Sequence, residues 1–287
     1  MPSSGTDCAL AAGGYVLTTY AFPPGGLPGQ DVSPEGAAIF TEAYAFIPAI
    51  TMRDIVTSFF PGWQDTRGWI IARPLSGFAE TFAQYAMEVA PGGGSDSPEP
   101  DAAAQAVLFV AEGLMHLEID GITHSLASGG YAYIPAGSVW RLCNPGDTAL
   151  RFHWVRKRYE PVAGLARPEP FVTSDADTPV NWMPNTDKWG TTRFVEPTDL
   201  RHDMHVNIVT FRTGGLIPFA ETHVMEHGLY VLQGTARYLL NKDWVEVGPG
   251  DFMWLRAFCP QACIATGDED FRYLLYKDVN RHPALTV

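Results

Sequence analysis

The stretch Gly215-Leu-Ile-Pro-Phe-Ala-Glu221-Thr-His223-Val-Met-Glu-His227 brings one carboxylate and two imidazoles to the spacing of metal ligands. Glu221 and His223 are two residues apart, so on a β-strand their side chains leave from the same face. Four residues of straight strand would carry His227 about 13 Å from His223. We therefore expect the chain to reverse within residues 224–226 and to place His227 on the neighbouring strand, back beside the other two groups.

The fourth donor can be the side-chain oxygen of Gln261, which ends a second glycine-led segment that begins at Gly250. The glycine frame around these donors occurs twice in the chain. Three glycines of the first half recur 121 residues later: Gly94, Gly113 and Gly129, then Gly215, Gly234 and Gly250. Self-similarity of this kind indicates two copies of one domain.

The first copy lacks donor residues. At the places that correspond to the four candidate ligands it has Pro100, Ala102, Ala106 and Trp140. None of these side chains can hold a metal, so we expect the first copy to keep the fold without the chemistry. The polar residues of the second copy could also be merely solvated or packed. That alternative is weaker, because the two copies share their glycines and differ in kind at the four donor positions.

The spacing is similar to that of the cupin family, whose first motif reads glycine, five residues, His-x-His, three or four residues, Glu, six residues, glycine. Here Glu221 stands at the first His position and His227 at the Glu position. In the second cupin motif, Gln261 stands where a His is usual, and Arg256 and Phe258 replace a Pro and a Gly. The resemblance implies an all-β bicupin with two tandem double-stranded β-helix (jelly-roll) barrels.

The expected domains are residues 1–160, an N-terminal segment with a metal-free first barrel; residues 161–190, a proline-rich connector; and residues 191–287, the second barrel with the active site. Short β-rich runs separated by glycine predict the strands of both barrels. They lie at residues 82–89, 107–111, 114–119, 130–134 and 150–155, and then at 204–211, 228–232, 236–240 and 271–276. Apolar runs at 15–22 and 43–47 predict strands that add to the sheets.

Two further segments narrow the resemblance. Tyr276-Lys277-Asp278-x-Asn280-Arg281 follows the unusual donor set, and Arg156-Lys-Arg-Tyr159-Glu-Pro-Val closes the first half. With them the chain resembles the bicupin (S)-ureidoglycine aminohydrolase family, also called glyoxylate-induced proteins. The resemblance implies hydrolytic release of ammonia from (S)-ureidoglycine, giving ureidoglycolate, at a manganese centre in allantoin breakdown.

The donor chemistry favours a hard cation independently of the resemblance. Glu221, His223, His227 and Gln261 form a mixed set of two oxygens and two imidazoles, which suits Mn²⁺ better than the compact or thiolate-rich sites of Zn²⁺. Another divalent metal stays open. Four protein ligands leave two octahedral positions for substrate groups or water, which the ion can polarise.

The resemblance also implies a substrate pocket formed by Tyr238, Tyr273 and Lys277, with Lys277 pairing the substrate carboxylate. Tyr273 and Lys277 are four apart and share a strand face. The alternative is that both tyrosines pack in the core and Lys277 caps the barrel rim. Glu221 is the better candidate for handling the substrate amine, because Glu226 is expected to be a solvated turn residue.

Other polar residues near the motif are expected to lie outside the chemistry. His202 and His205 are expected to be surface residues or hydrogen-bonded core residues, and Arg256 is either an anion contact or a surface arginine. Cys259 and Cys263, which flank Gln261, are expected to be small buried residues.

The composition is that of a soluble globular protein with an excess of acidic residues. The chain has 32 acidic and 19 basic residues, a net charge of -13, so neither nucleic acid nor an anionic membrane is an expected partner. We expect a small-molecule ureide substrate and a homo-oligomer. The start of the sequence has no secretory pattern, and the four cysteines are irregularly placed. Reduced thiols and a cytoplasmic location are the simplest interpretation.

Two other classes of function remain open at this stage. Ligand spacing alone does not separate an aminohydrolase from another metal-dependent cupin enzyme, such as an iron dioxygenase. Consumption of dioxygen with Fe²⁺ would favour the dioxygenase. A non-catalytic cupin that binds a small molecule would be expected to lack donors in both halves, whereas only the first half lacks them here.

Overall fold

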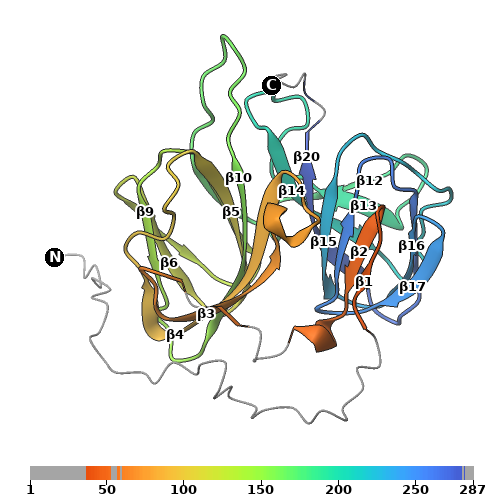
Figure 1. Cartoon of the computed structure of the whole chain (residues 1–287), viewed down its shortest axis with the longest axis horizontal. Coiled ribbons are helices and arrows are strands. Elements are labelled where there is room, and N and C mark those ends of the chain that lie inside the picture. Colours follow the sequence, from red (N-terminus) through yellow and green to blue (C-terminus); the bar gives the residue numbers. More distant parts are fainter. Residues whose placement is uncertain (1–36, 53–56, 59, 280, 282–287) are drawn as a thin grey trace.

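The computed structural model describes residues 37–52, 57–58, 60–279 and 281, and within them the regular secondary structure is almost entirely β-strand. Two barrels lie side by side (Figure 1). The class predicted from the sequence, an all-β bicupin, is confirmed. Two short 3-10 helices, η1 (Ala49–Thr51) and η3 (Pro74–Ser76), join strands near the start of the described chain.

The first barrel is built on one nine-stranded sheet with the order β11-β8-β5-β10-β4-β9-β6-β7, and β3 pairs with β4 at its side. In β6 buried residues alternate with half-buried ones, as the period of two requires for a sheet with one face on a core, whereas β5 and β8 are buried along most of their length because the second barrel covers their other face. Nine strands form the sheet. They are β3 (Gln64–Ala72), β4 (Phe82–Ser95), β5 (Ala104–Glu112), β6 (Met115–Ile119), β7 (Ile122–Leu126), β8 (Gly130–Ile134), β9 (Trp140–Cys143), β10 (Leu150–Arg158) and β11 (Phe171–Ser174).

The second barrel has an eight-stranded sheet, ordered β1-β2-β18-β15-β20-β14-β13-β12, and a three-stranded sheet, ordered β17-β16-β19. The strands of the larger sheet are β1 (Ile39–Phe40), β2 (Tyr44–Ile47), β12 (Val180–Trp182), β13 (Trp189–Thr192), β14 (Met204–Phe211), β15 (His227–Gln233), β18 (Phe252–Leu255) and β20 (Phe271–Asp278). Those of the smaller sheet are β16 (Ala236–Leu240), β17 (Asp243–Val247) and β19 (Gln261–Ala265).

All nine barrel strands predicted from the sequence are present, and β14 and β16 have the predicted bounds. The strand expected at residues 43–47 is also present as β2, but it pairs with β18 of the second barrel. The connector adds edge strands to both barrels, because β11 pairs with β8 and β12 pairs with β13. The strand expected at residues 15–22 lies outside the described residues.

The internal repeat has a steric basis in one glycine of each barrel. Gly113 and Gly234 both have positive φ, +84° and +71°. A Cβ at Gly113 would lie 2.8 Å from the Ala149 carbonyl oxygen, and a Cβ at Gly234 would lie 2.5 Å from that of Asp270. Only glycine combines this backbone conformation with so close an approach. The repeated glycines therefore mark equivalent turns, packed against the start of β10 in the first barrel and of β20 in the second.

Three apolar clusters hold the molecule together. One fills the first barrel, one fills the second, and the third lies between them, where the two large sheets face each other. In the third cluster, Phe82 of β4 stacks on Tyr276 of β20 with ring centroids 3.8 Å apart. At the same interface, the Lys157 ammonium lies 2.7 Å from the Asp203 carboxylate, and both side chains are buried. The barrels therefore share a continuous apolar and ionic interface.

The cysteines differ from the sequence expectation in part. Cys259 and Cys263 are free and buried, as predicted. Cys143 is disulfide-bonded, so the expectation of uniformly reduced thiols is wrong. The argument for a cytoplasmic location from reduced cysteines then rests on Cys259 and Cys263 alone. Within the described residues, no helix combines the length and the apolar character needed to cross a membrane.

The first prediction concerns acid stability. His153 of β10 is 4% exposed, and burial lowers its pKa from 6.5 to about 4. Above about pH 6.5 the imidazole is neutral in both the folded and the unfolded state. As the pH falls from about 6.5 toward 4, the unfolded state binds a proton that the folded state does not, so the protein loses stability. Between about pH 7.5 and pH 4.5, the free energy of unfolding should fall by about 2 kcal/mol less in His153→Phe than in the wild type. Urea unfolding at the two pH values measures this difference. Equal losses in both proteins would contradict the assignment.

Candidate active site

The four predicted metal donors lie at one end of the second barrel. His227 is the first residue of β15 and Gln261 the first of β19, and the chain bends at residues 224–225 before it enters β15, as predicted. Glu221 is joined to Gln261 by an isolated antiparallel bridge, with both N–H···O bonds at 2.9 Å. Phe258 donates its N–H to the His223 carbonyl at 2.6 Å, which fixes the loop that carries His223.

The donors differ in exposure and do not yet converge on one point. The Glu221 carboxylate lies 3.5 Å from Nε2 of His223, and these side chains are 21% and 34% exposed. His227 is 4% exposed, and its ring stacks on that of His223 with centroids 5.1 Å apart and planes 12° from parallel. In the described part of the chain, no three His, Cys, Asp or Glu side chains stand at metal-ligand geometry. Of these three side chains, His227 is the most buried.

Two buried tyrosines, Tyr238 and Tyr273, lie next to Gln261 inside the barrel. The Tyr238 hydroxyl donates to the Gln261 side-chain oxygen at 2.8 Å, and the Tyr238 and Tyr273 hydroxyls are 3.5 Å apart. Both side chains are fully buried, and burial raises the pKa of each well above 10. Each tyrosine is therefore a neutral phenol that can donate a hydrogen bond. Their burial in the barrel cluster also fits the packing role that the sequence left open.

Lys277 lies on the same inner row as His227. In β20 it pairs with His227 of β15 on one side and with His205 of β14 on the other, so the three side chains leave from one sheet face. Burial lowers the pKa of Lys277, and Glu221 opposes that shift. Lys277 and His205 also line a cavity of about 150 Å³ with His202 and Arg281. Lys277 therefore borders this cavity and is the strand neighbour of one of the four donors, His227.

Strand β14 places two polar residues that the sequence analysis did not assign to the site. His205 is 4% exposed and so is no surface residue, and burial lowers its pKa to about 4. Asn207 is two residues further along the same face, and its side-chain oxygen is buried without a hydrogen-bond partner among the described residues. The alternation of the predicted strand at 204–211 contained this signal, because residues 205, 207 and 209 share a face.

Glu226 was wrongly predicted to be a solvated turn residue. It is 6% exposed and turns toward the first barrel. Its carboxylate accepts hydrogen bonds from the backbone N–H groups of Glu80 and Thr81 at 2.9 and 2.6 Å, from the Thr81 hydroxyl, and from Nε1 of Trp254 at 2.8 Å. The residue next to His227 is therefore an anchor between the barrels. Arg256 pairs with Glu80 at 3.3 Å on the surface.

The corresponding region of the first barrel is apolar or internally paired. Trp140, in the place of Gln261, is buried and meets Trp154 edge to face, with ring centroids 5.8 Å apart. Arg156, in the place of Lys277, forms an ion pair with Glu99. Aromatic side chains fill the space that the second barrel leaves to its polar groups.

The fold and the single polar barrel end define a bicupin with one candidate site. A pattern described as the Cupin domain matches residues 85–156 and 207–276. A probable (S)-ureidoglycine aminohydrolase of Oryza sativa subsp. japonica is 33% identical over 82% of this chain and 74% of its own length. The (S)-ureidoglycine aminohydrolase of Escherichia coli (strain K12) is 29% identical over 81% and 88%. The crystal structure of a putative glyoxylate induced protein from Pseudomonas aeruginosa is 61% identical, with a TM-score of 0.84, over 89% of this chain and 96% of its own.

These similarities extend over both barrels, and they include relatives above 30% identity that are matched over most of their length. The chain belongs to the (S)-ureidoglycine aminohydrolase family of cupin proteins.

Proposed function

We propose that this protein is a hydrolase acting on a C–N bond, which releases ammonia from (S)-ureidoglycine and gives ureidoglycolate. The main support is that one end of one barrel holds all four candidate donors, Glu221, His223, His227 and Gln261. The curated relatives of the chain bear the name of this enzyme. The test is ammonia release from enzymatically generated (S)-ureidoglycine. Absence of ammonia release with Mn²⁺ present would reject the proposal.

We propose that the same four residues hold one divalent cation, with Mn²⁺ preferred. Membership of the cupin family suggests metal binding, and the donor set supports a hard ion, because a carboxylate and an amide oxygen accompany two imidazoles. The buried Nδ1 of His227 has no hydrogen-bond partner among the described residues. When bound, the cation supplies Lewis-acid polarisation of the substrate and of water.

The protein's own groups would orient the substrate. Lys277 is the charged group suited to pair the substrate carboxylate, because its ammonium is half-buried and faces the donors. Tyr238 and Tyr273, as neutral phenols, donate hydrogen bonds that hold Gln261 and the bound ureide. Glu221 is the carboxylate suited to accept a proton from or return one to the substrate amine, since it lies at the partly exposed edge of the site.

The second prediction tests Lys277. Lys277→Met removes the charge and keeps much of the aliphatic stem. Loss of a charge-assisted hydrogen bond costs about 1.5 to 3 kcal/mol, so kcat/KM should fall roughly ten- to a hundred-fold while metal content stays unchanged. Lys242→Met, at an exposed lysine, is the matched control and should keep wild-type kinetics. Unchanged kinetics in Lys277→Met would place this lysine on the barrel rim, outside the chemistry.

We also propose that the protein forms a homo-oligomer and is located in the cytoplasm. The proposed domain limits lie near residues 160 and 190. Light scattering on the purified chain tests the first of these, and fractionation of the producing cell tests the second. A monomer in solution would reject the oligomer.

A further inference from the structure

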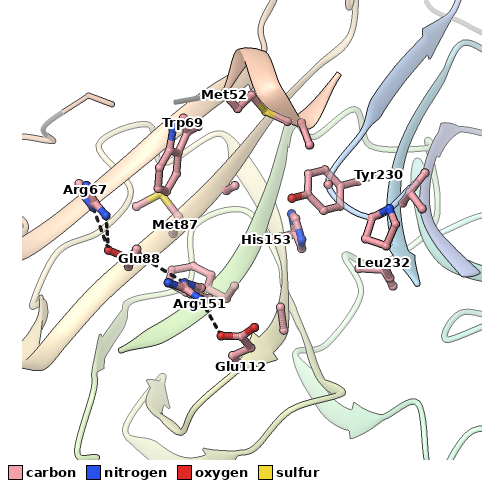
Figure 2. A pocket seen from close by; sticks show the side chains of 17 residues that line it. Met52, Arg67, Trp69, Met87, Glu88, Glu112, Arg151, His153, Tyr230 and Leu232 are labelled. Atoms are coloured by element: carbon pink, nitrogen blue, oxygen red, sulfur yellow. Dashed lines mark hydrogen bonds and ion pairs between the residues drawn. The ribbon is translucent and has the colours of Figure 1, made fainter. Parts of the chain in front are cut away.

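A cavity of about 480 Å³ lies between the two barrels, separate from the candidate active site. The first barrel contributes β3, β4 and β10, the second barrel contributes β15, and Met52 lies just after η1. In Figure 2, Trp69 and Met52 stand across the space from Tyr230, and His153 lies beneath Tyr230. Both barrels therefore form the walls.

At the floor of the cavity the small side chain of Ala86 lies between two large ones, Trp69 and His153. Across three neighbouring strands, Ala86 of β4 is paired with Trp69 of β3 on one side and with His153 of β10 on the other. Neighbouring strands are about 4.8 Å apart, so the backbones of Trp69 and His153 are separated by roughly 10 Å. Stacked rings prefer centroid distances of about 4.5 to 7 Å. One flat ring placed above Ala86 can thus contact both side chains.

The polar side chain at this slot is an imidazole with one unpaired nitrogen. His153 is 4% exposed, and its Nδ1 has no hydrogen-bond partner among the described residues. Its ring lies 4.1 Å from that of Tyr230, and in Figure 2 the Tyr230 hydroxyl points toward the open space. Burial keeps His153 neutral by lowering its pKa to about 4. A neutral imidazole has one donor and one acceptor, and a buried polar atom of this kind ordinarily has a partner.

The charges at the cavity edge cancel one another. Two arginines and two glutamates alternate across the sheet and are ion-paired (Figure 2). Glu88 lies 2.8 Å from Arg67 and 3.0 Å from Arg151, and Arg151 lies 2.8 Å from Glu112. A charged ligand would find no unmatched counter-charge in this row. The remaining walls are apolar or aromatic, namely Trp69, Met52, Met87 and Leu232.

We infer that the inter-barrel cavity binds a neutral, planar heterocycle of the nucleobase type, stacked above Ala86 and hydrogen-bonded to His153. The flat shape follows from the slot between Trp69 and His153. The neutrality follows from the balanced row of charges, and the donor and acceptor groups of the ring follow from the unpaired imidazole. This site is independent of the four metal donors of the second barrel.

Uracil and adenine are the probes, with benzoate as a charged planar control and cyclohexanol as a neutral non-planar one. Binding is measured by saturation-transfer NMR and calorimetry on the full chain. We expect a nucleobase to bind at millimolar concentration or better and neither control to bind. Absence of binding by both nucleobases, or equal binding of benzoate, would overturn the inference.

Two variants locate the site. Ala86→Leu fills the slot, and His153→Phe keeps a ring and removes its hydrogen bonds. Each should weaken nucleobase binding at least tenfold, whereas Ala127→Leu, at an exposed alanine, should not. Ammonia release and circular dichroism serve as folding controls, because neither position touches the candidate active site. Wild-type nucleobase affinity in folded Ala86→Leu would contradict binding in this cavity.

Discussion

His223→Ala is expected to lose the bound divalent cation and ammonia release together. The substitution removes one of only two imidazoles and leaves a carboxylate, an amide and His227. Changes that merely disturb the support of a metal ligand cost about 10- to 100-fold in affinity or activity. Loss of a ligand itself should exceed roughly 100-fold in both. Elemental analysis after loading with Mn²⁺, together with steady-state kinetics, measures the two effects.

His124→Ala, in the first barrel, is the matched control and should keep one metal per chain and wild-type activity. The wild-type stoichiometry should be one, because Trp140 and apolar neighbours occupy the corresponding end of the first barrel. Two tightly bound ions per chain would contradict a single site. Circular dichroism should show a folded His223→Ala protein, since the barrel core contains no metal donor. Unfolding would instead make the site structural.

The architecture could be predicted because residues close together in the sequence determine its turns and strands. Glycine spacing marks the equivalent turns at Gly113 and Gly234, and alternating apolar residues mark strands such as β14 and β16. These signals depend on backbone sterics and on a period of two, and both act locally. The edge strands were harder to assign. The partner of β2 is β18, which lies more than 200 residues further along the chain, and no local pattern specifies such a pairing.

The candidate donors could also be placed at one barrel end from spacing, but the orientation of each polar side chain could not. Glu226 and His227 are adjacent, and strand alternation sends them to opposite faces. The sequence shows that Glu226 faces away from the donors without showing what it meets there. The answer depends on the inter-barrel interface, where Thr81 and Trp254 approach it. His205 was likewise set aside because its neighbour Lys277 becomes visible only through strand pairing.

Glu226→Ala should cause a large loss of stability without touching a metal donor. The carboxylate is buried and accepts four hydrogen bonds, from two groups of Thr81, from the Glu80 backbone and from the Trp254 indole. Truncation leaves the buried Trp254 indole N–H without its partner and removes the shared acceptor of the part-buried Glu80 and Thr81 groups. Removing one partner of a buried charged network costs about 3 to 5 kcal/mol. The melting temperature should fall on the order of 10 °C, as measured by calorimetry at neutral pH.

Two further substitutions separate the anchor from a general effect of losing a charge. Glu246→Ala removes an exposed carboxylate paired with Arg237 at 3.2 Å, and should change stability by less than about 1 kcal/mol. Glu226→Gln keeps the volume and one acceptor oxygen but turns an amide N–H toward groups that are themselves donors, so its loss should fall between the other two. If Glu226→Ala melted as the wild type does, water would replace the carboxylate and Glu226 would not anchor the barrels. Because His227 directly follows Glu226, a loosened anchor should also lower Mn²⁺ affinity in the folded variant.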